Sequence, residues 1–208
     1  MYIPAYFAET RIPVLHDAIR ANGFATLVTM TEDGLAASHI PLLIDPSPAP
    51  YGTLIGHLAR ANPQARAAIG DALAMFLGPN GYITPSYYAT KHETGKAVPT
   101  WNYTAIHASG PLRFIADKHE LLDLVTRLTV HHETPRAEPW AVSDAPADFV
   151  DTMLNGIAGF ALTIAKLEGK WKMGQNRPAA DRAGVVAGLR ADGRPDLAEV
   201  AAEAARTA

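Results

Sequence analysis

Four segments of the 208-residue sequence carry more polar and aromatic side chains than a strand or a loop needs. They are Ser38–Pro41, His57–Asn62, Lys96–Tyr103 and Glu168–Arg177. In the second segment a predicted strand runs into a predicted helix, and Arg60 lies at the corner. Such a corner suits a phosphate, because backbone N–H groups at a helix start favour an anion and a guanidinium can hold two oxygen atoms. Aromatic side chains nearby would cover a flat ring system.

Each of these signals also has a purely structural explanation. Trp101 and Trp171 lie in apolar strands, where tryptophan commonly belongs to the core. Arg60 could form a surface ion pair, and Glu168–Arg177 could be a solvated basic face. The run His131–Glu133 lacks the i, i+4 spacing of paired metal-binding histidines, and we predict no metal site.

The composition sets the class of protein. Apolar residues make up 48% and charged residues 19% of the chain, as in ordinary globular proteins. The formal net charge of −3 provides no general attraction to nucleic acid, and the absence of cysteine excludes disulfides and thiolate chemistry. The sequence predicts neither a signal peptide nor a membrane span, so we expect a cytoplasmic protein without a membrane partner. We expect one domain over 1–208, with a helical tail from about residue 178.

Alternating apolar residues and turn residues predict a series of antiparallel strands. Hairpin turns are predicted at Asp33-Gly34, at Gly78–Gly81 and at Ser109-Gly110. The predicted strands are 25–31, 35–44, 52–58, 72–77, 82–84, 100–107, 111–115 and a last one from Phe160 to Lys172. The predicted helices are one from Thr10 to Asn22, one capped by Asn62, one after Asp117 and one over 146–154; residues 91–96 are predicted as a loop. This order indicates an α+β domain built on a small antiparallel β-barrel.

The segments taken together resemble the PaiB family, the FMN-binding negative transcriptional regulators. The resemblance extends from Met1 to about Arg190 and rests on MYIPAYF, ATLVT, SHIPLLID, GHLARANPQ, GPNGYITPSYY, GKAVPTWNY, HASGPL and LEGKWKMGQNRPAADRAGVVAGL. It implies an antiparallel split β-barrel with inserted and C-terminal helices, related to pyridoxine-phosphate oxidases. It also implies a homodimer that holds FMN between its subunits.

The same resemblance implies which residues contact FMN. Arg60 would hold the phosphate, the strand with Ser38–Pro41 would follow the edge of the isoalloxazine, and the Lys170–Arg177 segment of the partner would close the site. The implied cofactor-binding residues are Ser38, His39, Ile40, Pro41, His57, Leu58, Ala59, Arg60, Asn62, Lys96, Trp101, Asn102, Lys170, Trp171, Lys172, Gln175 and Arg177.

The sequence leaves three functional hypotheses open. The first is an FMN-binding regulator that binds DNA, although the sequence has no helix-turn-helix pattern. The second is a flavin-dependent oxidoreductase acting on a small molecule, with a nicotinamide electron donor and a lid of Tyr87, Tyr88, Trp101 and Tyr103. A third hypothesis is a different planar ligand, haem, with a histidine as axial ligand.

Overall fold

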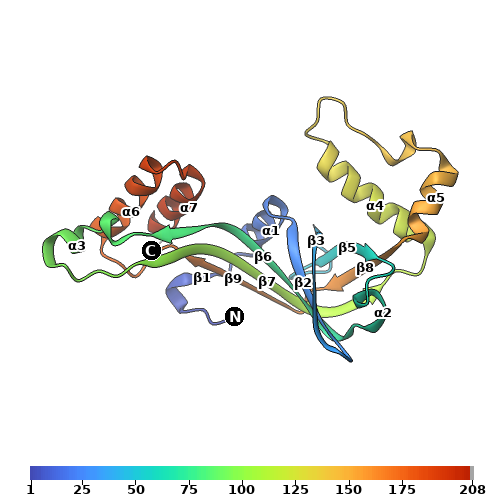
Figure 1. Cartoon of the computed structure of the whole chain (residues 1–208), viewed down its shortest axis with the longest axis horizontal. Helices are drawn as coiled ribbons and strands as arrows, with labels where there is room; N and C mark the ends of the chain where they lie inside the picture. The colour runs from blue at the N-terminus through green and yellow to red at the C-terminus, as the bar shows by residue number, and fades with distance from the viewer. Residues whose placement is uncertain (207–208) are drawn as a thin grey trace. The chain divides into compact units, whose positions relative to one another are not determined.

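A computed structural model of the protein describes residues 1–206 and shows a mixed α+β chain with one antiparallel sheet of nine strands (Figure 1). The strands are β1 (Ala8–Glu9), β2 (Phe24–Thr31), β3 (Gly34–Pro41), β4 (Leu43–Asp45), β5 (Thr53–Ala59), β6 (Ile69–Ile83), β7 (Thr100–Phe114), β8 (Ile157–Thr163) and β9 (Lys166–Lys172). The helices are η1 (Ala5–Phe7), α1 (Ile12–Ala21), α2 (Gln64–Ala67), η2 (Pro85–Tyr87), α3 (Ala89–Thr94), α4 (Lys118–Glu133), η3 (Val142–Asp144), α5 (Ala147–Asn155), α6 (Ala179–Ala191) and α7 (Pro195–Arg206).

The strands follow the order β3-β2-β6-β7-β8-β5-β4, while β9 pairs with β1 and β7. No pairing within residues 1–206 joins β3 to β4, so the sheet is open. The α+β class and the antiparallel sheet predicted from the sequence are confirmed. The chain divides into two compact units: unit 1 holds Met1–Leu15, Leu77–Ile106 and the chain from Glu168 onward, and unit 2 holds His16–Phe76 and His107–Leu167.

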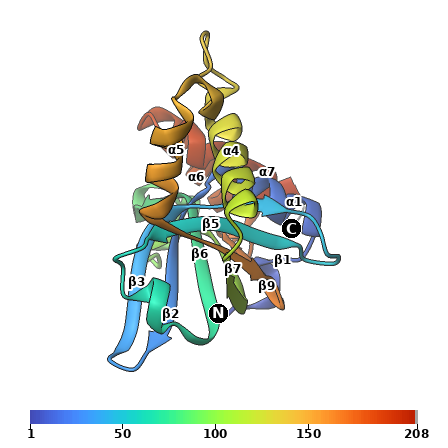
Figure 2. The same cartoon turned by 90° about the vertical axis from the view of Figure 1, so that its right-hand side faces the viewer.

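Unit 2 is built around the β2–β3 hairpin and the pairing of β5 with β8. The hairpin predicted near Asp33-Gly34 is found, but its loop is Glu32 and Asp33, between Thr31 and Gly34. Neither loop residue has a positive φ, so the loop is not the primed turn that was predicted; the positive φ of 109° falls on Gly34, the first residue of β3. Helix α4 begins after Asp117, whose carboxylate accepts a hydrogen bond from the N–H of Glu120. Its buried leucines pack on Ile55 of β5 and on β8, and α5 lies beside α4 (Figure 2).

Unit 1 is built from α6 and α7 packed on the ends of β6 and β9. Ile83, Met173 and Leu197 come from β6, from the end of β9 and from α7, and all three are buried in one apolar cluster. Tyr88 belongs to the same cluster, and the phenol of Tyr87 donates a hydrogen bond to Asp192. The lid predicted to include Tyr87 and Tyr88 is therefore wrong for these two residues, because both side chains pack against α6.

Two predicted turns are absent because β6 and β7 each run on for 15 residues. Among residues 1–206 neither Gly78 nor Gly81 has a positive φ, and an added Cβ at Gly81 would meet Leu197 at 3.0 Å. An added Cβ at Gly110 would overlap the carbonyl oxygen of Thr163. These last two glycines allow a close approach of neighbouring elements, so tertiary packing overrides their turn preference.

Other predicted elements are divided differently in the structure. The strand predicted over 35–44 is β3 followed by β4, because Leu42 breaks the ladder and its N–H donates to Gly23 O at 2.8 Å. The strand predicted to run from Phe160 to Lys172 is β8 followed by β9, separated where Ile164 and Ala165 donate to Gly52 O and Ser109 O. The loop predicted over 91–96 is mostly α3, which ends at Gly95 with a φ of 70°.

The helix predicted from Thr10 to Asn22 is found at Ile12–Ala21, the one after Asp117 is α4, and the one predicted over 146–154 is found at Ala147–Asn155. The tail up to Arg206 forms helices α6 and α7, as predicted. No helix within residues 1–206 has the length and apolar character needed to cross a membrane.

We expect Gly110→Ala to lower the free energy of unfolding by about 2–4 kcal/mol, because its Cβ would have to displace backbone. Gly156→Ala is the matched control, since Gly156 has helical φ and its new Cβ would meet only Met153 O, at 3.3 Å. Urea unfolding measures both. An equal loss of unfolding free energy in the two variants would contradict the crowding of Gly110 against the backbone of Thr163.

Candidate functional site

The predicted phosphate corner lies in unit 2, where β5 leads into α2. The carboxamide oxygen of Asn62 accepts a hydrogen bond from the N–H of Gln64 at 3.0 Å, but the N-cap of α2 is Pro63, one residue after the predicted cap. The Asn62 N–H donates to Ala59 O at 2.9 Å, and the Arg60 N–H donates to Gly156 O at 2.8 Å. The free N–H groups expected for an anion are therefore already engaged, because α2 is only four residues long and is tied to its neighbours.

Arg60 is the exposed cation of this corner. Its Nε donates to the carbonyl oxygen of Asn155 at 2.7 Å, which fixes the guanidinium beside the end of α5. Within residues 1–206 its two Nη atoms have no hydrogen-bond partner. Arg60 thus keeps its two Nη groups as donors for an anion, whereas the backbone around it has fewer free N–H groups than the sequence suggested.

A buried glutamine beside the corner was missed by the sequence analysis. Gln64 is 1% exposed, and its amide donates to Thr29 Oγ1 at 3.0 Å and to Ala36 O at 3.1 Å. Ser38 Oγ donates to the Gln64 carbonyl oxygen, and Asn62 Nδ2 donates to Ser38 Oγ at 2.9 Å. This network ties α2 to β2 and β3, so the side chains of Ser38 and Asn62 have structural bonds of their own. Nothing in the sequence around Gln64 distinguishes it from a surface helix residue.

The other predicted residues of β3 divide between its two faces. His39 is exposed, with its Nδ1 3.0 Å from Thr26 Oγ1, and Pro41 lies on the same face two residues along. Ile40 lies on the opposite face with Ser38, half-buried.

The predicted residues of β5 divide in the same way. Leu58 is buried, at 2% exposure, and Ala59 is exposed. His57 is half-buried, its Nδ1 has no partner within residues 1–206, and burial lowers its pKa. Strand alternation places His57 on the same face as Ile55, the face that α4 covers.

The remaining predicted residues lie in unit 1, and β9 separates them. Successive side chains of a strand point to opposite faces. Trp171 and Gln175 line a cavity next to α7, and neither Lys170 nor Lys172 lines it. Lys170 and Lys172 instead contact Tyr2 and β7. The Lys170–Lys172 segment therefore presents two separate surfaces instead of the single one that the resemblance implied.

Lys170 and Lys172 of β9 are held without a salt bridge to a carboxylate of residues 1–206. Lys170 is 8% exposed, donates to Tyr2 O at 3.1 Å and lies 5.2 Å from the ring centre of Tyr103. Lys172 donates to Thr100 Oγ1 at 2.6 Å and to the carbonyl oxygen of Trp101. Burial, together with the charges of Lys170 and Arg177, lowers the pKa of Lys172. No carboxylate in residues 1–206 forms a salt bridge with either lysine, so an anion would relieve the charge.

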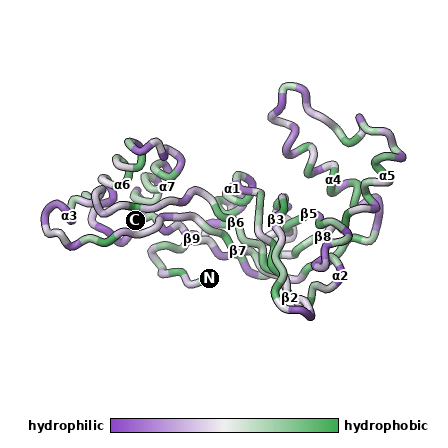
Figure 3. The backbone as a smooth tube through the Cα atoms, viewed as in Figure 1, coloured by the Kyte–Doolittle hydropathy of each residue, from purple (hydrophilic) through white to green (hydrophobic). Residues whose placement is uncertain are grey.

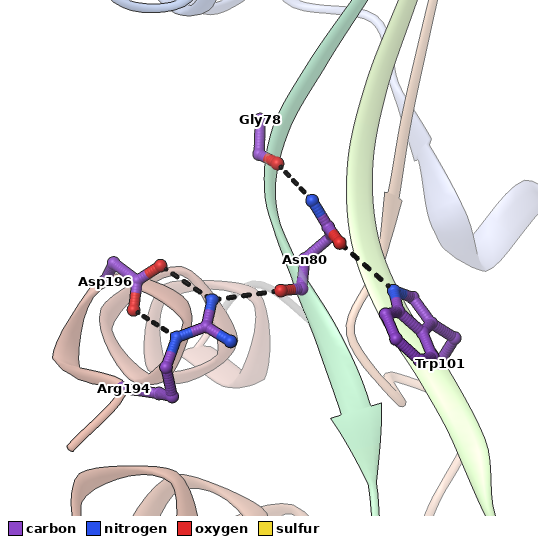
Figure 4. A network of polar contacts seen from close by, with 5 residues as sticks. All are labelled: Gly78, Asn80, Trp101, Arg194 and Asp196. Carbon is purple, nitrogen blue, oxygen red and sulfur yellow. Dashed lines mark hydrogen bonds and ion pairs between the residues drawn. The ribbon is translucent and has the colours of Figure 1, made fainter.

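Trp101 adds an exposed aromatic ring that is held in place (Figure 4). It is 51% exposed, its indole N–H donates to Asn80 Oδ1 at 3.2 Å, and its ring centre lies 6.4 Å from that of Tyr82. Asn80 is fixed in turn, because Arg194 donates to its carbonyl oxygen at 2.9 Å and pairs with Asp196. The sequence predicts a turn at Asn80, and its contact with Trp101 is seen only in the structure.

Four predicted residues of unit 1 have structural roles or lie apart from this surface. Gln175 holds its own loop, donating to Trp171 O at 2.6 Å. Arg177 lies 3.9 Å from the ring centre of Tyr88, where it belongs to the packing of α6. Asn102 is 2% exposed, on the face of β7 opposite Trp101, and Lys96 is exposed after α3.

We call Tyr2, Tyr82, Trp101, Tyr103, Lys170 and Lys172 the aromatic–lysine surface of unit 1. Tyr2 and Tyr82 are 83% and 54% exposed, so flat rings are available to a ligand. Two ammonium groups without carboxylates fit a phosphate, and exposed rings fit a planar heterocycle. The residues of this surface therefore fit a phosphorylated flavin.

Comparison with known proteins decides the family. A family model described as "Putative FMN-binding domain" matches residues 1–166. The chain belongs to this FMN-binding family. The PaiB resemblance is confirmed by a Bacillus subtilis relative, "Protease synthase and sporulation protein PAI 2", which is 32% identical over 97% of this chain and 95% of its own. FMN, the cofactor predicted from the sequence, is the ligand that gives the family its description.

Other similar proteins agree in extent or in fold. An uncharacterized protein of Aspergillus fumigatus is 36% identical over 91% of this chain and 90% of its own length. Among solved structures, the flavocytochrome Anf3 of Azotobacter vinelandii has a TM-score of 0.59 at 12% identity, covering 82% of this chain and 72% of that one. The FAD and heme binding protein of Mycobacterium smegmatis has a TM-score of 0.54 at 16% identity, covering 85% and 78%. At such low identities, these two comparisons show only that the solved structures have a fold similar to that of this protein.

Proposed function

We propose that the protein is an FMN-binding homodimer in which each FMN contacts both chains. Arg60 of one chain and the aromatic–lysine surface of the other would hold the cofactor. The observation that carries the proposal is the pair Lys170 and Lys172, held partly buried without a carboxylate partner. We also propose that the two units form one split-barrel domain and that the protein is cytoplasmic; the flavin- and haem-binding proteins of similar fold support the first of these.

In this proposal the side chains bind and orient the cofactor. A phosphate monoester carries almost two negative charges at neutral pH and calls for at least two cationic groups. Lys172 meets this need most directly, since a nearby anion would stabilise an ammonium group whose pKa is lowered by burial. Trp101 and Tyr82 would cover one side of the ring system. FMN, once bound, supplies the redox chemistry.

An uncovered apolar face in unit 2 supports the homodimer. Met30 lies opposite Leu35 in β3 and opposite Ile69 in β6, and the three side chains are 46%, 75% and 52% exposed. Phe24, at the other end of β2, is 70% exposed, and β2 carries apolar colouring along its length (Figure 3). We call Phe24, Met30, Leu35 and Ile69 the outer β2 face. An apolar face of this kind is typical of an interface between protein chains.

The outer β2 face also links the interface to the cofactor. By strand alternation His39 and Pro41 share the face of β3 that presents Leu35. Both residues are among the predicted FMN contacts. A second copy seated on this face would therefore meet residues of the cofactor site, as expected for FMN held between subunits.

We propose further that the dimer is a negative transcriptional regulator of the PaiB type. The name of the Bacillus subtilis relative, which refers to protease synthesis and sporulation, supports this role. A flavin-dependent oxidoreductase is the second candidate. The observation that favours it is Trp101, which Asn80 holds in an exposed position where a second planar molecule could stack.

We expect Lys172→Met and Arg60→Ala each to weaken FMN binding roughly 10- to 100-fold, the scale of one charge-assisted hydrogen bond. Arg66→Ala is the matched control, because Arg66 is an exposed arginine on α2. Quenching of flavin fluorescence on titration of FMN measures all three variants. An unchanged FMN affinity in Arg60→Ala would show that the corner between β5 and α2 does not bind FMN. An unchanged affinity in Lys172→Met would show the same for the aromatic–lysine surface.

We expect Met30→Glu to turn the dimer into monomers, because it places a charge at the centre of the outer β2 face. Val98→Glu is the control: Val98 is 68% exposed and lies outside that face. Sedimentation equilibrium measures the mass of both variants. A parent protein that is monomeric at micromolar concentration, or a Met30→Glu protein that stays dimeric, would contradict the interface.

The two candidate roles predict different measurements on the FMN-loaded protein. A regulator should bind promoter DNA with an affinity that falls steeply as salt rises, since phosphate contacts release counterions. An oxidoreductase should show flavin reduction by NADH or NADPH at a rate that saturates with donor. Absence of DNA binding at low salt would reject direct repression, and unchanged flavin absorbance with both donors would reject a nicotinamide-dependent enzyme.

A further inference from the structure

Unit 1 contains a cavity of about 710 Å³ on the side of β9 away from the aromatic–lysine surface. Its lining includes residues of the N-terminal segment, β9 and α7, among them Tyr6, Glu9, Arg11, Trp171, Glu199 and Glu203. We call it the α7 cavity. Its volume falls within the range of small-molecule sites, about 300–1,000 Å³.

The α7 cavity is separate from the proposed flavin site. Trp171 points into it, while Lys170 and Lys172 point to the other face of the same strand. A ligand here would therefore bind independently of FMN.

The walls of the cavity are aromatic. Tyr6 is 53% exposed and Trp171 is half-buried, so both rings remain available to a ligand. The indole N–H of Trp171 has no hydrogen-bond partner among the residues that the structure describes. Val14, Val200 and small alanine side chains complete an apolar lining.

The charges of the cavity leave an excess of carboxylate. Arg11 grips Glu9 through Nε at 2.9 Å and Nη2 at 2.6 Å, so this pair is internally neutral. Burial alone would raise the pKa of Glu9, but the hydrogen bonds and charge of Arg11 lower it, so Glu9 is ionised at neutral pH. Glu199 and Glu203 are four residues apart on α7 and repel each other. Glu203 pairs with Arg206, whereas Glu199 has no ion pair within residues 1–206.

We infer that the α7 cavity binds a small organic cation with an apolar or aromatic body. A quaternary or primary ammonium group gains from the faces of Tyr6 and Trp171 through cation–π attraction. Glu199 supplies the opposite charge at the rim of the cavity, and the apolar lining covers the body of the ligand. An anion would meet repulsion from α7, and a neutral ligand would leave Glu199 without an ion pair among residues 1–206.

The test uses benzyltrimethylammonium chloride as the probe and isothermal titration calorimetry on the full chain, with and without FMN. Benzyl alcohol and benzoate serve as neutral and anionic probes of similar body. We expect saturable binding of the cation alone, with the same affinity in the presence of FMN and a weaker affinity at higher salt.

Two variants locate the binding. Glu199→Gln should weaken binding of the cation roughly two- to fivefold, on the scale of an exposed ion pair, and Glu93→Gln, which changes an exposed glutamate on α3, should leave it unchanged. Tyr6→Ala should weaken it by a similar factor, and because Tyr6 is exposed this variant should keep the fold, which circular dichroism checks. No saturable binding in the millimolar range, equal binding of benzyl alcohol, or equal affinity in Glu199→Gln and Glu93→Gln would overturn the inference.

Discussion

Lys170 and Lys172 of β9 are partly withdrawn from water, and neither forms a salt bridge with a carboxylate of residues 1–206. Lys170 is bound to a carbonyl oxygen and two tyrosine rings, and Lys172 to a hydroxyl and a carbonyl oxygen. Dipoles and ring faces compensate a buried positive charge only in part, which is why the pKa of Lys172 is lowered. A fold that keeps such a pair is prepared for an anion. A phosphorylated flavin fits this requirement, and the family to which the chain belongs is described by FMN.

The alternation of a single strand gives unit 1 two different surfaces. On one side of β9, Lys170 and Lys172 contact residues of β7, including the ring of Tyr103. On the other side, Trp171 lines the α7 cavity, which is rich in carboxylates. The two sides prefer ligands of opposite charge. This separation follows from the geometry of a strand, in which adjacent side chains are directed away from each other. The loop that follows is held by its own side chains, because Gln175 bonds to Trp171 O and Arg177 stacks on Tyr88.

Unit 2 uses most of its polar groups for its own cohesion. Gln64 satisfies three backbone or side-chain partners from β2 and β3, and through Ser38 and Asn62 it fixes the corner after β5. A buried amide so fully bonded makes the corner rigid. Arg60 is then the group at this corner with donors left over. Among the described residues, unit 2 also has an uncovered apolar surface, the outer β2 face, and a His57 Nδ1 without a hydrogen-bond partner.

The sequence by itself determined the family, the cofactor class, the α+β antiparallel architecture and the local signals that depend on neighbouring residues. The hairpin near Asp33-Gly34, the Asp117 cap and the helices of the tail were predictable, because caps, tight turns and helix preference are decided within a few residues. Tertiary structure alone decided that Gly78–Gly81 and Ser109-Gly110 lie inside long strands, since helix α7 and the backbone of Thr163 press against these glycines from distant parts of the chain. It also decided that Gln64 is buried, that Asn80 holds Trp101 and that Trp171 and Lys172 face opposite ways. Those outcomes depend on which residues meet in space, and a local pattern does not contain that information.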